Sequence, residues 1–178
     1  PKGPRLVLSR GDPMFVADRT GSSPQQIYRD RAGVHAHFPV WSTDGAWIYF
    51  LSSRSGSSQV WRIAVAGGEA EQVTMLPVDL NGFALFPDGK RLVVAADVWP
   101  DARSLADSAA RDEAKAKDKV QARAYESLLF RHWDQWEDGK FSHLFVWTPP
   151  SLGGKADDAR DLTPRQLTDS PTHPFGGM

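Results

Sequence analysis

The sequence has no cysteine among its 178 residues. Disulfide frameworks and thiolate metal sites are therefore excluded, but oxidising compartments permit disulfides without requiring them, so the compartment is left open. Neither sign of charge dominates, because 21 basic residues stand against 22 acidic ones, for a net charge of -1. A balanced charge favours neither nucleic acid nor an anionic membrane, and we expect neither as a partner.

Long apolar runs are also missing. The longest, around Leu92 to Ala96, is far shorter than the roughly 20 residues that cross a bilayer as a helix. The first residues lack the apolar stretch of a signal peptide, and the chain begins with proline rather than methionine. We expect trimmed ends, and we leave the localisation, cytoplasmic or periplasmic, open.

Strand-forming residues and turn signals are abundant instead. Four short strands are predicted between Phe38 and Thr74, in "FPVWSTDGAWIYFLSSRSGSSQVWRIAVAGGEAEQVT". Turns at Asp44-Gly45, at residues 54–57 and at Gly67-Gly68 separate them, because glycine supplies the positive φ that tight hairpins need. Both faces of the second strand are apolar, which favours a strand that is covered on two sides.

This pattern recurs along the chain. "FALFPDGKRLVVAADV" places Asp88-Gly89 at the position of Asp44-Gly45, 44 residues later, close to the roughly 40 to 45 residues of a propeller blade. Upstream, "MFVADRTGSSPQQIYRD" resembles "YFLSSRSGSSQVWRI", so a third repeat is partly present. Near the end, "RQLTDSPTHPF" resembles "EQVTMLPVDLNGF", which matches Thr168 to Thr74.

We therefore predict an all-β fold, namely a partial β-propeller of about three four-stranded blades with a helical insertion in one blade. Residues 1–178 are expected to form the N-terminal part of the propeller domain, with blades near 14–35, 36–76 and 77–167. The alternative is a compact three-sheet fold that is complete in itself. Because propellers close with roughly 4 to 8 blades, we expect further blades from the remainder of the same polypeptide, and we leave a homo-oligomer open.

The predicted insertion covers residues 101–137. Ser104 to Leu129 is helical by composition, with Ser104 and Asp107 as a capping box, and Phe141 to Trp147 resumes the interrupted blade as its third strand. Long insertions on a rigid scaffold often carry binding residues, so the insertion is where we expect function.

Several motifs resemble one particular family. They are "SSRSGSSQVWRIAVAGGEAEQVT", "DGKRLVVAADV", "LLFRHWDQWEDGKFSHLFVW" and "SPTHPFGG". Together they resemble the N-terminal propeller of serine peptidases of the prolyl oligopeptidase family, in the branch of dipeptidyl-peptidase 5 and acylaminoacyl-peptidase-like enzymes. The resemblance implies a C-terminal α/β-hydrolase domain, absent from this chain, that cuts short peptides with a Ser, Asp and His triad, while the propeller restricts access and helps to bind substrate.

The chain has no G-x-S-x-G motif, so no catalytic residue is assigned to it, and no cofactor is expected. The alternative is a TolB-like propeller that binds other proteins without catalysis. "RHWDQW" argues against it, because this string has no place in the generic TolB pattern.

The candidate substrate-binding residues lie where the insertion returns to the blade. A peptide's free amine needs a carboxylate beside an apolar wall, which Asp134 and Trp136 could supply. The other interpretation is structural, with charged pairs to blade neighbours and tryptophans filling a seam. The full candidate set is Arg131, His132, Trp133, Asp134 and Trp136, with Glu126 and Glu137 as weaker candidates for the amine. His35 and His37 could share a strand face as a metal pair would, but no third ligand lies at a telling spacing, and no metal is expected.

Overall fold

The computed structural model describes residues 5–9, 13–29, 34, 36–120, 131–132, 135–136, 139–150, 154 and 158–164. Antiparallel meanders dominate this part of the chain. The first sheet contains β1 (Arg5–Ser9), β2 (Pro13–Asp18) and β3 (Gln25–Arg29). The second contains β4 (Ala36–Trp41), β5 (Trp47–Ser52), β6 (Gln59–Ala64) and β7 (Glu71–Gln72). The third contains β8 (Gly82–Leu85), β9 (Leu92–Val98), β12 (Phe141–Trp147) and β13 (Arg160–Asp161).

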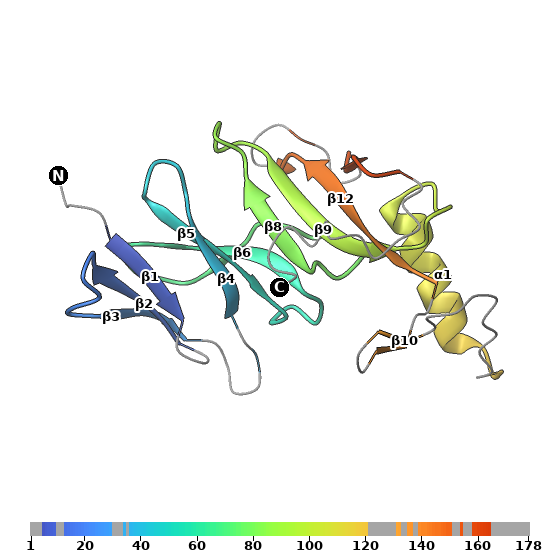
Figure 1. Ribbon diagram of the computed structural model, residues 1–178, viewed down its shortest axis with the longest axis horizontal. Helices are drawn as coiled ribbons and strands as arrows, with labels where there is room; N and C mark the ends of the chain where they lie inside the picture. Colours follow the sequence, from blue (N-terminus) through green and yellow to red (C-terminus); the bar gives the residue numbers. More distant parts are fainter. Residues whose placement is uncertain are drawn as a thin grey trace.

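The three sheets follow one another along the long axis of the molecule (Figure 1). Their first strands lie next to one another, since β4 contacts both β1 and β8. The helix α1 (Leu105–Lys117) and the small hairpin of β10 (Arg131–His132) and β11 (Gln135–Trp136) stand at the far end, beside the third sheet. The predicted array of hairpins with a helical insertion in one sheet is therefore present.

Two equivalent turns show why the sheets resemble one another. The amide of Gly45 donates to the carbonyl of Ser42 at 3.0 Å, and the amide of Gly89 donates to that of Phe86 at 2.9 Å. Both glycines have a positive φ, of 67° and 66°, which costs little without a Cβ. The Asp-Gly pairs thus fold into the same turn 44 residues apart, as the sequence predicts.

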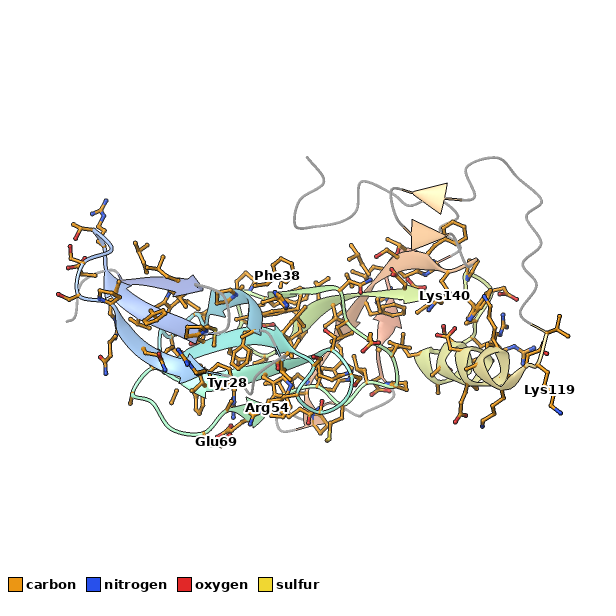
Figure 2. All side chains as sticks on the ribbon, turned by 90° about the horizontal axis from the view of Figure 1, so that it is seen from below. Tyr28, Phe38, Arg54, Glu69, Lys119 and Lys140 are labelled. Carbon is orange, nitrogen blue, oxygen red and sulfur yellow. The ribbon has the colours of Figure 1, made fainter. Side chains whose placement is uncertain are left out.

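The core lies in two seams between the sheets. Between the first and second sheets, Phe50 is fully buried and its ring centroid lies 4.8 Å from that of Tyr28. Arg54 also crosses this seam and donates to the Tyr28 hydroxyl at 3.1 Å (Figure 2). The seam between the second and third sheets buries Leu51, Val60, Phe83, Leu92, Val94, Phe145 and Trp147. Since β5 contributes to both seams, the predicted two-sided burial of this strand is confirmed.

A buried polar network joins the second sheet to the chain that follows it. Thr74 is fully buried, and its hydroxyl accepts from the amide of Val60 at 2.8 Å and donates to Gln59 Oε1 at 2.8 Å. In the third sheet, the amide of Leu144 donates to the hydroxyl of Thr163 at 3.0 Å in the same way. The expected match of Thr74 to Thr168 is therefore corrected to Thr163, and Thr168 lies outside the described residues.

The helix is shorter than predicted. Ser104 is the expected N-cap, since its hydroxyl accepts from the amide of Asp107 at 3.1 Å, but the Asp107 carboxylate accepts from the amide of Arg103, so the capping box is only half formed. The helix ends at Lys117 rather than continuing toward Leu129. Asp118 adopts an extended conformation with ψ of 131°, and its carboxylate accepts from the amide of Val120 at 2.9 Å. This local hydrogen bond competes with the helical one, which explains the early end. In the described residues, no helix is long and apolar enough to cross a membrane.

Candidate functional site

The insertion leaves and re-enters the third sheet at adjacent points. Val98, the last residue of β9, is paired with Phe141, the first residue of β12, and the register continues without a shift to Leu92 and Trp147. The sheet therefore forms as though the insertion were absent. The two ends of the segment between residues 98 and 141 therefore lie at one end of the sheet, and loops on a rigid scaffold often carry function.

The hairpin of β10 and β11 carries most of the described candidate residues. Arg131 is paired with Trp136, and His132 with Gln135, in an antiparallel register. The structure therefore brings Arg131 and Trp136 to directly opposite positions. Trp133, Asp134, Glu126 and Glu137 lie outside the described residues. Direct contact of this set with a substrate stays a prediction.

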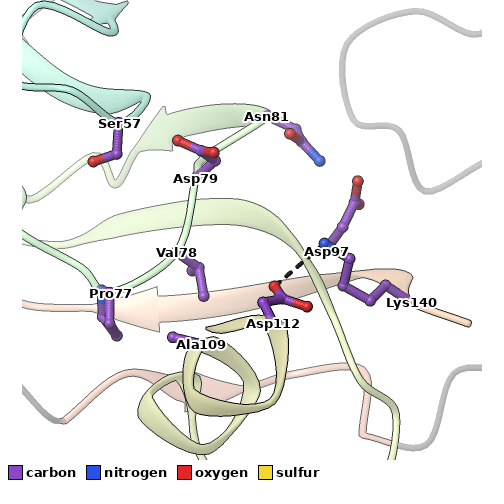
Figure 3. A pocket seen from close by; sticks show the side chains of 9 residues that line it. All are labelled: Ser57, Pro77, Val78, Asp79, Asn81, Asp97, Ala109, Asp112 and Lys140. Atoms are coloured by element: carbon purple, nitrogen blue, oxygen red, sulfur yellow. Dashed lines mark hydrogen bonds and ion pairs between the residues drawn. The ribbon is translucent and has the colours of Figure 1, made fainter. Parts of the chain in front are cut away.

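A cavity of about 340 Å³ opens beside the insertion (Figure 3). Four separate segments contribute to it: the turn after β5, the linker that precedes β8, the end of β9, and the insertion with its return. Its polar lining consists of Ser57, Asp79, Asn81, Asp97, Asp112 and Lys140. Three carboxylates against one ammonium group make the lining net negative, so the cavity is suited to cations and amines rather than to anions.

Two of the three carboxylates of this cavity, those of Asp112 and Asp79, are held in place by hydrogen bonds. Asp112 accepts from the indole Nε1 of Trp99 at 2.9 Å and from Lys140 Nζ at 3.3 Å. Asp79 accepts from the amide of Ser58 at 2.6 Å. At the other side of α1, the hydrogen bond from Arg111 holds the pKa of Asp101 below its ordinary value. The hydrogen bonds from Trp99 and Lys140 to Asp112 therefore hold the middle of α1 next to the ends of β9 and β12.

The sequence did not indicate this cavity. Its polar residues come from positions 57 to 140, and no spacing connects them before the sheets are packed. His35 and His37 are the two residues that the sequence offered as a metal pair, although no metal site was expected. His37 lies on β4, and His35 falls outside the described residues. Within the described part of the chain, no group of three or more His, Asp or Glu side chains is arranged to hold a metal ion.

Known proteins with similar sequences include dipeptidyl-peptidases. No family model matches the chain. Dipeptidyl-peptidase 5 of Porphyromonas endodontalis is 31% identical over 139 residues, which cover 76% of this chain and 18% of that protein. Dipeptidyl-peptidase 5 of Porphyromonas gingivalis is 26% identical over 165 residues, which cover 93% of this chain and 22% of that protein. The chain therefore spans about a fifth of the length of these curated relatives.

Solved structures share the fold. An acylaminoacyl peptidase of Pyrococcus horikoshii superimposes with a TM-score of 0.54 at 12% identity, covering 89% of this chain and 23% of that one. TolB of Acinetobacter baumannii superimposes with a TM-score of 0.50 at 15% identity, covering 90% of this chain and 29% of that one. At such low identity these likenesses show the fold alone. They confirm the predicted fold class, a partial β-propeller with four-stranded blades and a helical insertion.

The sheets and the sequence relatives together define a propeller region of the kind associated with peptidases. As its motifs predicted, the chain is related to the peptidases of the prolyl oligopeptidase family, and it corresponds to a part of their length.

Proposed function

We propose that this chain is the propeller segment of a serine-type peptidase that hydrolyses short peptides. One observation carries the proposal. The match to the Porphyromonas gingivalis dipeptidyl-peptidase 5 extends over 165 residues, or 93% of the chain. A match of this length must include the second and third sheets and the whole insertion, whichever residue of the chain it starts from. A relationship that extends through the insertion supports this proposal over a generic propeller.

In this proposal the segment gates access to an α/β-hydrolase domain outside the given sequence. The first strands β1, β4 and β8 lie side by side, and buried seams join the sheets into one array. A rigid array of blades can exclude folded proteins while it admits short peptides. The gate therefore selects substrates by size, and the loops at the ends of the blades supply contacts.

The insertion is the part that we propose contacts substrate. The β10–β11 hairpin places Arg131 opposite Trp136, and Asp134 lies between them in sequence. A carboxylate beside an indole would hold a peptide's free amine through a charge-assisted hydrogen bond next to apolar surface.

The test of the peptidase assignment uses the full-length polypeptide that contains this chain. We expect a fluorophosphonate probe to label one serine outside residues 1–178, located by peptide mass spectrometry. We also expect hydrolysis of dipeptidyl coumarin amides and no cleavage of a folded protein such as native ribonuclease. Absence of both labelling and hydrolysis would overturn the assignment.

The test of amine binding uses Asp134→Ala in the same polypeptide. The variant should lower kcat/KM about tenfold or more for substrates with a free amine, and much less for N-acetylated ones, because only the former lose the charge-assisted bond. Glu113→Ala is the control, since Glu113 is a solvated acid of the same insertion, 72% exposed. An equal loss on both substrate types would rule out the proposed contact.

The second candidate function is a TolB-like propeller that only binds proteins. The likeness in fold to TolB supports it, since the TM-score of 0.50 is close to that of the peptidase. A full-length polypeptide that takes up no fluorophosphonate and cleaves no peptide would favour this alternative.

A further inference from the structure

Trp99 directly follows β9 and is the first residue of the connection to β12, residues 99–140, which contains the insertion. Its backbone amide donates to the hydroxyl of Ser108 at 3.2 Å, and its indole Nε1 donates to Asp112 Oδ1 at 2.9 Å. The ammonium group of Lys115 lies 4.9 Å from the centre of the ring. These three partners are spaced as neighbours on one face of α1, so a single tryptophan holds the helix along two turns.

The same tryptophan meets the chain where the insertion returns. Gly139 has a φ of 90°, and a Cβ placed on it would lie only 2.9 Å from Cζ3 of Trp99. The next residue, Lys140, forms an ion pair with Asp112 at 3.3 Å (Figure 3). The Asp112 carboxylate thus receives one hydrogen bond from each end of the insertion.

The sheet itself does not require this tryptophan. By the 44-residue repeat, Trp99 corresponds to Ser55 of the uninterrupted second sheet, which lies in the turn between β5 and β6. The second sheet therefore makes the same strand pairing without an aromatic residue at this position. In the third sheet, Trp99 therefore serves to contact α1 and the returning chain at Gly139.

These contacts lie close to the proposed substrate-binding hairpin. Gly139 follows Trp136 by three residues, so at most about 10 Å of extended chain separates the Trp99 ring contact from the end of β11. A constraint on Gly139 therefore limits where the hairpin can lie.

We propose that Trp99 is a positioning residue for the β10–β11 hairpin, acting through Asp112 and Gly139. Its role in substrate binding rests on the proposed function, whereas its role in holding the hairpin does not. The indole N–H fixes the ring to α1, and the ring fixes the returning chain. Together they present the hairpin at one place beside the third sheet.

Two substitutions weaken these contacts to different degrees. Trp99→Phe removes the donor to Asp112 and shortens the ring beside Gly139, whereas Trp99→Leu removes the aromatic ring altogether. Trp61→Phe is the matched control: the Trp61 Nε1 atom is buried and has no hydrogen-bond partner in the described part of the chain, so this change removes no such bond.

Hydrogen exchange of the full-length polypeptide, followed by mass spectrometry, reports on the hairpin directly. Because a hydrogen bond to a charged acceptor is lost, we expect Trp99→Phe to speed exchange in peptides covering residues 131–140 about tenfold. Trp99→Leu should speed it further, while Trp61→Phe leaves this region unchanged and the seams should keep their protection in all three. Unchanged exchange at residues 131–140 in both Trp99 variants would overturn the proposal.

Steady-state kinetics on dipeptidyl coumarin amides then test the consequence. Trp99→Phe should raise KM several-fold with kcat nearly retained, because the hairpin is displaced while the hydrolase domain is untouched. A fast-exchanging hairpin with an unchanged KM would overturn its link to substrate binding. A polypeptide that neither labels with fluorophosphonate nor hydrolyses peptides would refute the proposed function instead, and the exchange data would still decide whether Trp99 holds the hairpin.

Discussion

The second and third sheets follow one plan but differ in how their middle strands are connected. Residues 53–58 join β5 to β6, whereas residues 99–140 join β9 to β12. The pairing is nevertheless the same, because Ser52 opposes Gln59 in one sheet and Ala96 opposes His143 at the equivalent position of the other. Strand register is thus set by the side chains that the seam buries, since the entropy cost of a longer loop grows slowly with its length.

The two sheets also attach their outer strands differently. Gln59 and His143 occupy equivalent positions, and each is 1% exposed. The Gln59 amide donates to the carbonyls of Leu76 and Val78, so a neutral network holds the chain after β7. Nδ1 of His143 lies 2.8 Å from Asp161 Oδ2, so a hydrogen-bonded His–Asp pair holds β13. The buried polar position is kept while its chemistry changes.

The largest expected effect concerns the seam that has no insertion beside it. Phe50→Ala should lower the free energy of unfolding by about 3–5 kcal/mol, because it opens a cavity under Tyr28. Phe38→Ala is the control: it removes the same ring at a site that is 45% exposed and should cost about 1 kcal/mol or less. Urea denaturation measures both, and similar costs would mean that the seam is not a close-packed core.

The next prediction compares the cost of replacing one glycine in each connection, residues 53–58 and residues 99–140. Gly56 and Gly139 both have a positive φ, of 99° and 90°, but a Cβ meets nothing within 4 Å at Gly56 and meets the Trp99 ring at Gly139. Gly56→Ala should therefore cost about 1–2 kcal/mol of backbone strain, and Gly139→Ala about 1–3 kcal/mol more from the clash. Thermal unfolding gives the difference. If Gly139→Ala were no worse than Gly56→Ala, the contact with Trp99 would not be tight.

Two threonines test the attachment of the outer strands. Thr74→Val leaves the amide of Val60 without an acceptor in a fully buried site, which should cost about 1–3 kcal/mol. Thr163→Val removes the acceptor for Leu144 at a half-buried site, where water can replace it, so we expect less than about 1 kcal/mol. Urea midpoints of the two variants should differ in this order, and the reverse order would contradict the comparison.

The smallest effect is common to the Asp-Gly turns of both sheets. The hydrogen bond from the Ser42 hydroxyl lowers the pKa of Asp44 below its ordinary value of 3.8, and the amide of Lys90 does the same for Asp88. A lowered folded pKa stabilises the fold above the ordinary value, and this contribution is lost as the pH falls through the folded pKa. The melting temperatures of the protein and of the Asp44→Asn, Asp88→Asn variant should therefore differ at pH 7 and converge below pH 3.8. A gap that stays constant would refute this linkage.

The sequence predicts the hairpins well because each depends on local chemistry. Asp-Gly pairs and alternating apolar residues specify both turn and strand within a few positions, as at Asp44 and Asp88. The end of α1 was missed because one hydrogen bond from the amide of Val120 to the Asp118 carboxylate outweighs a helical composition. Thr163 was missed because "RDLT" and "RQLT" follow one another, and only pairing with β12 distinguishes them. The cavity beside α1 depends on packing between distant segments, which no local pattern reports.

The pairing of Val98 with Phe141 has one more consequence. Paired residues of neighbouring antiparallel strands have Cα atoms only about 4.5–5.5 Å apart, so the two ends of the insertion nearly touch. A segment whose ends lie so close together can be replaced by another segment without moving β9 and β12 apart. An exchange of residues 99–140 can therefore change what the third sheet presents while the pairing of β9 with β12 stays the same.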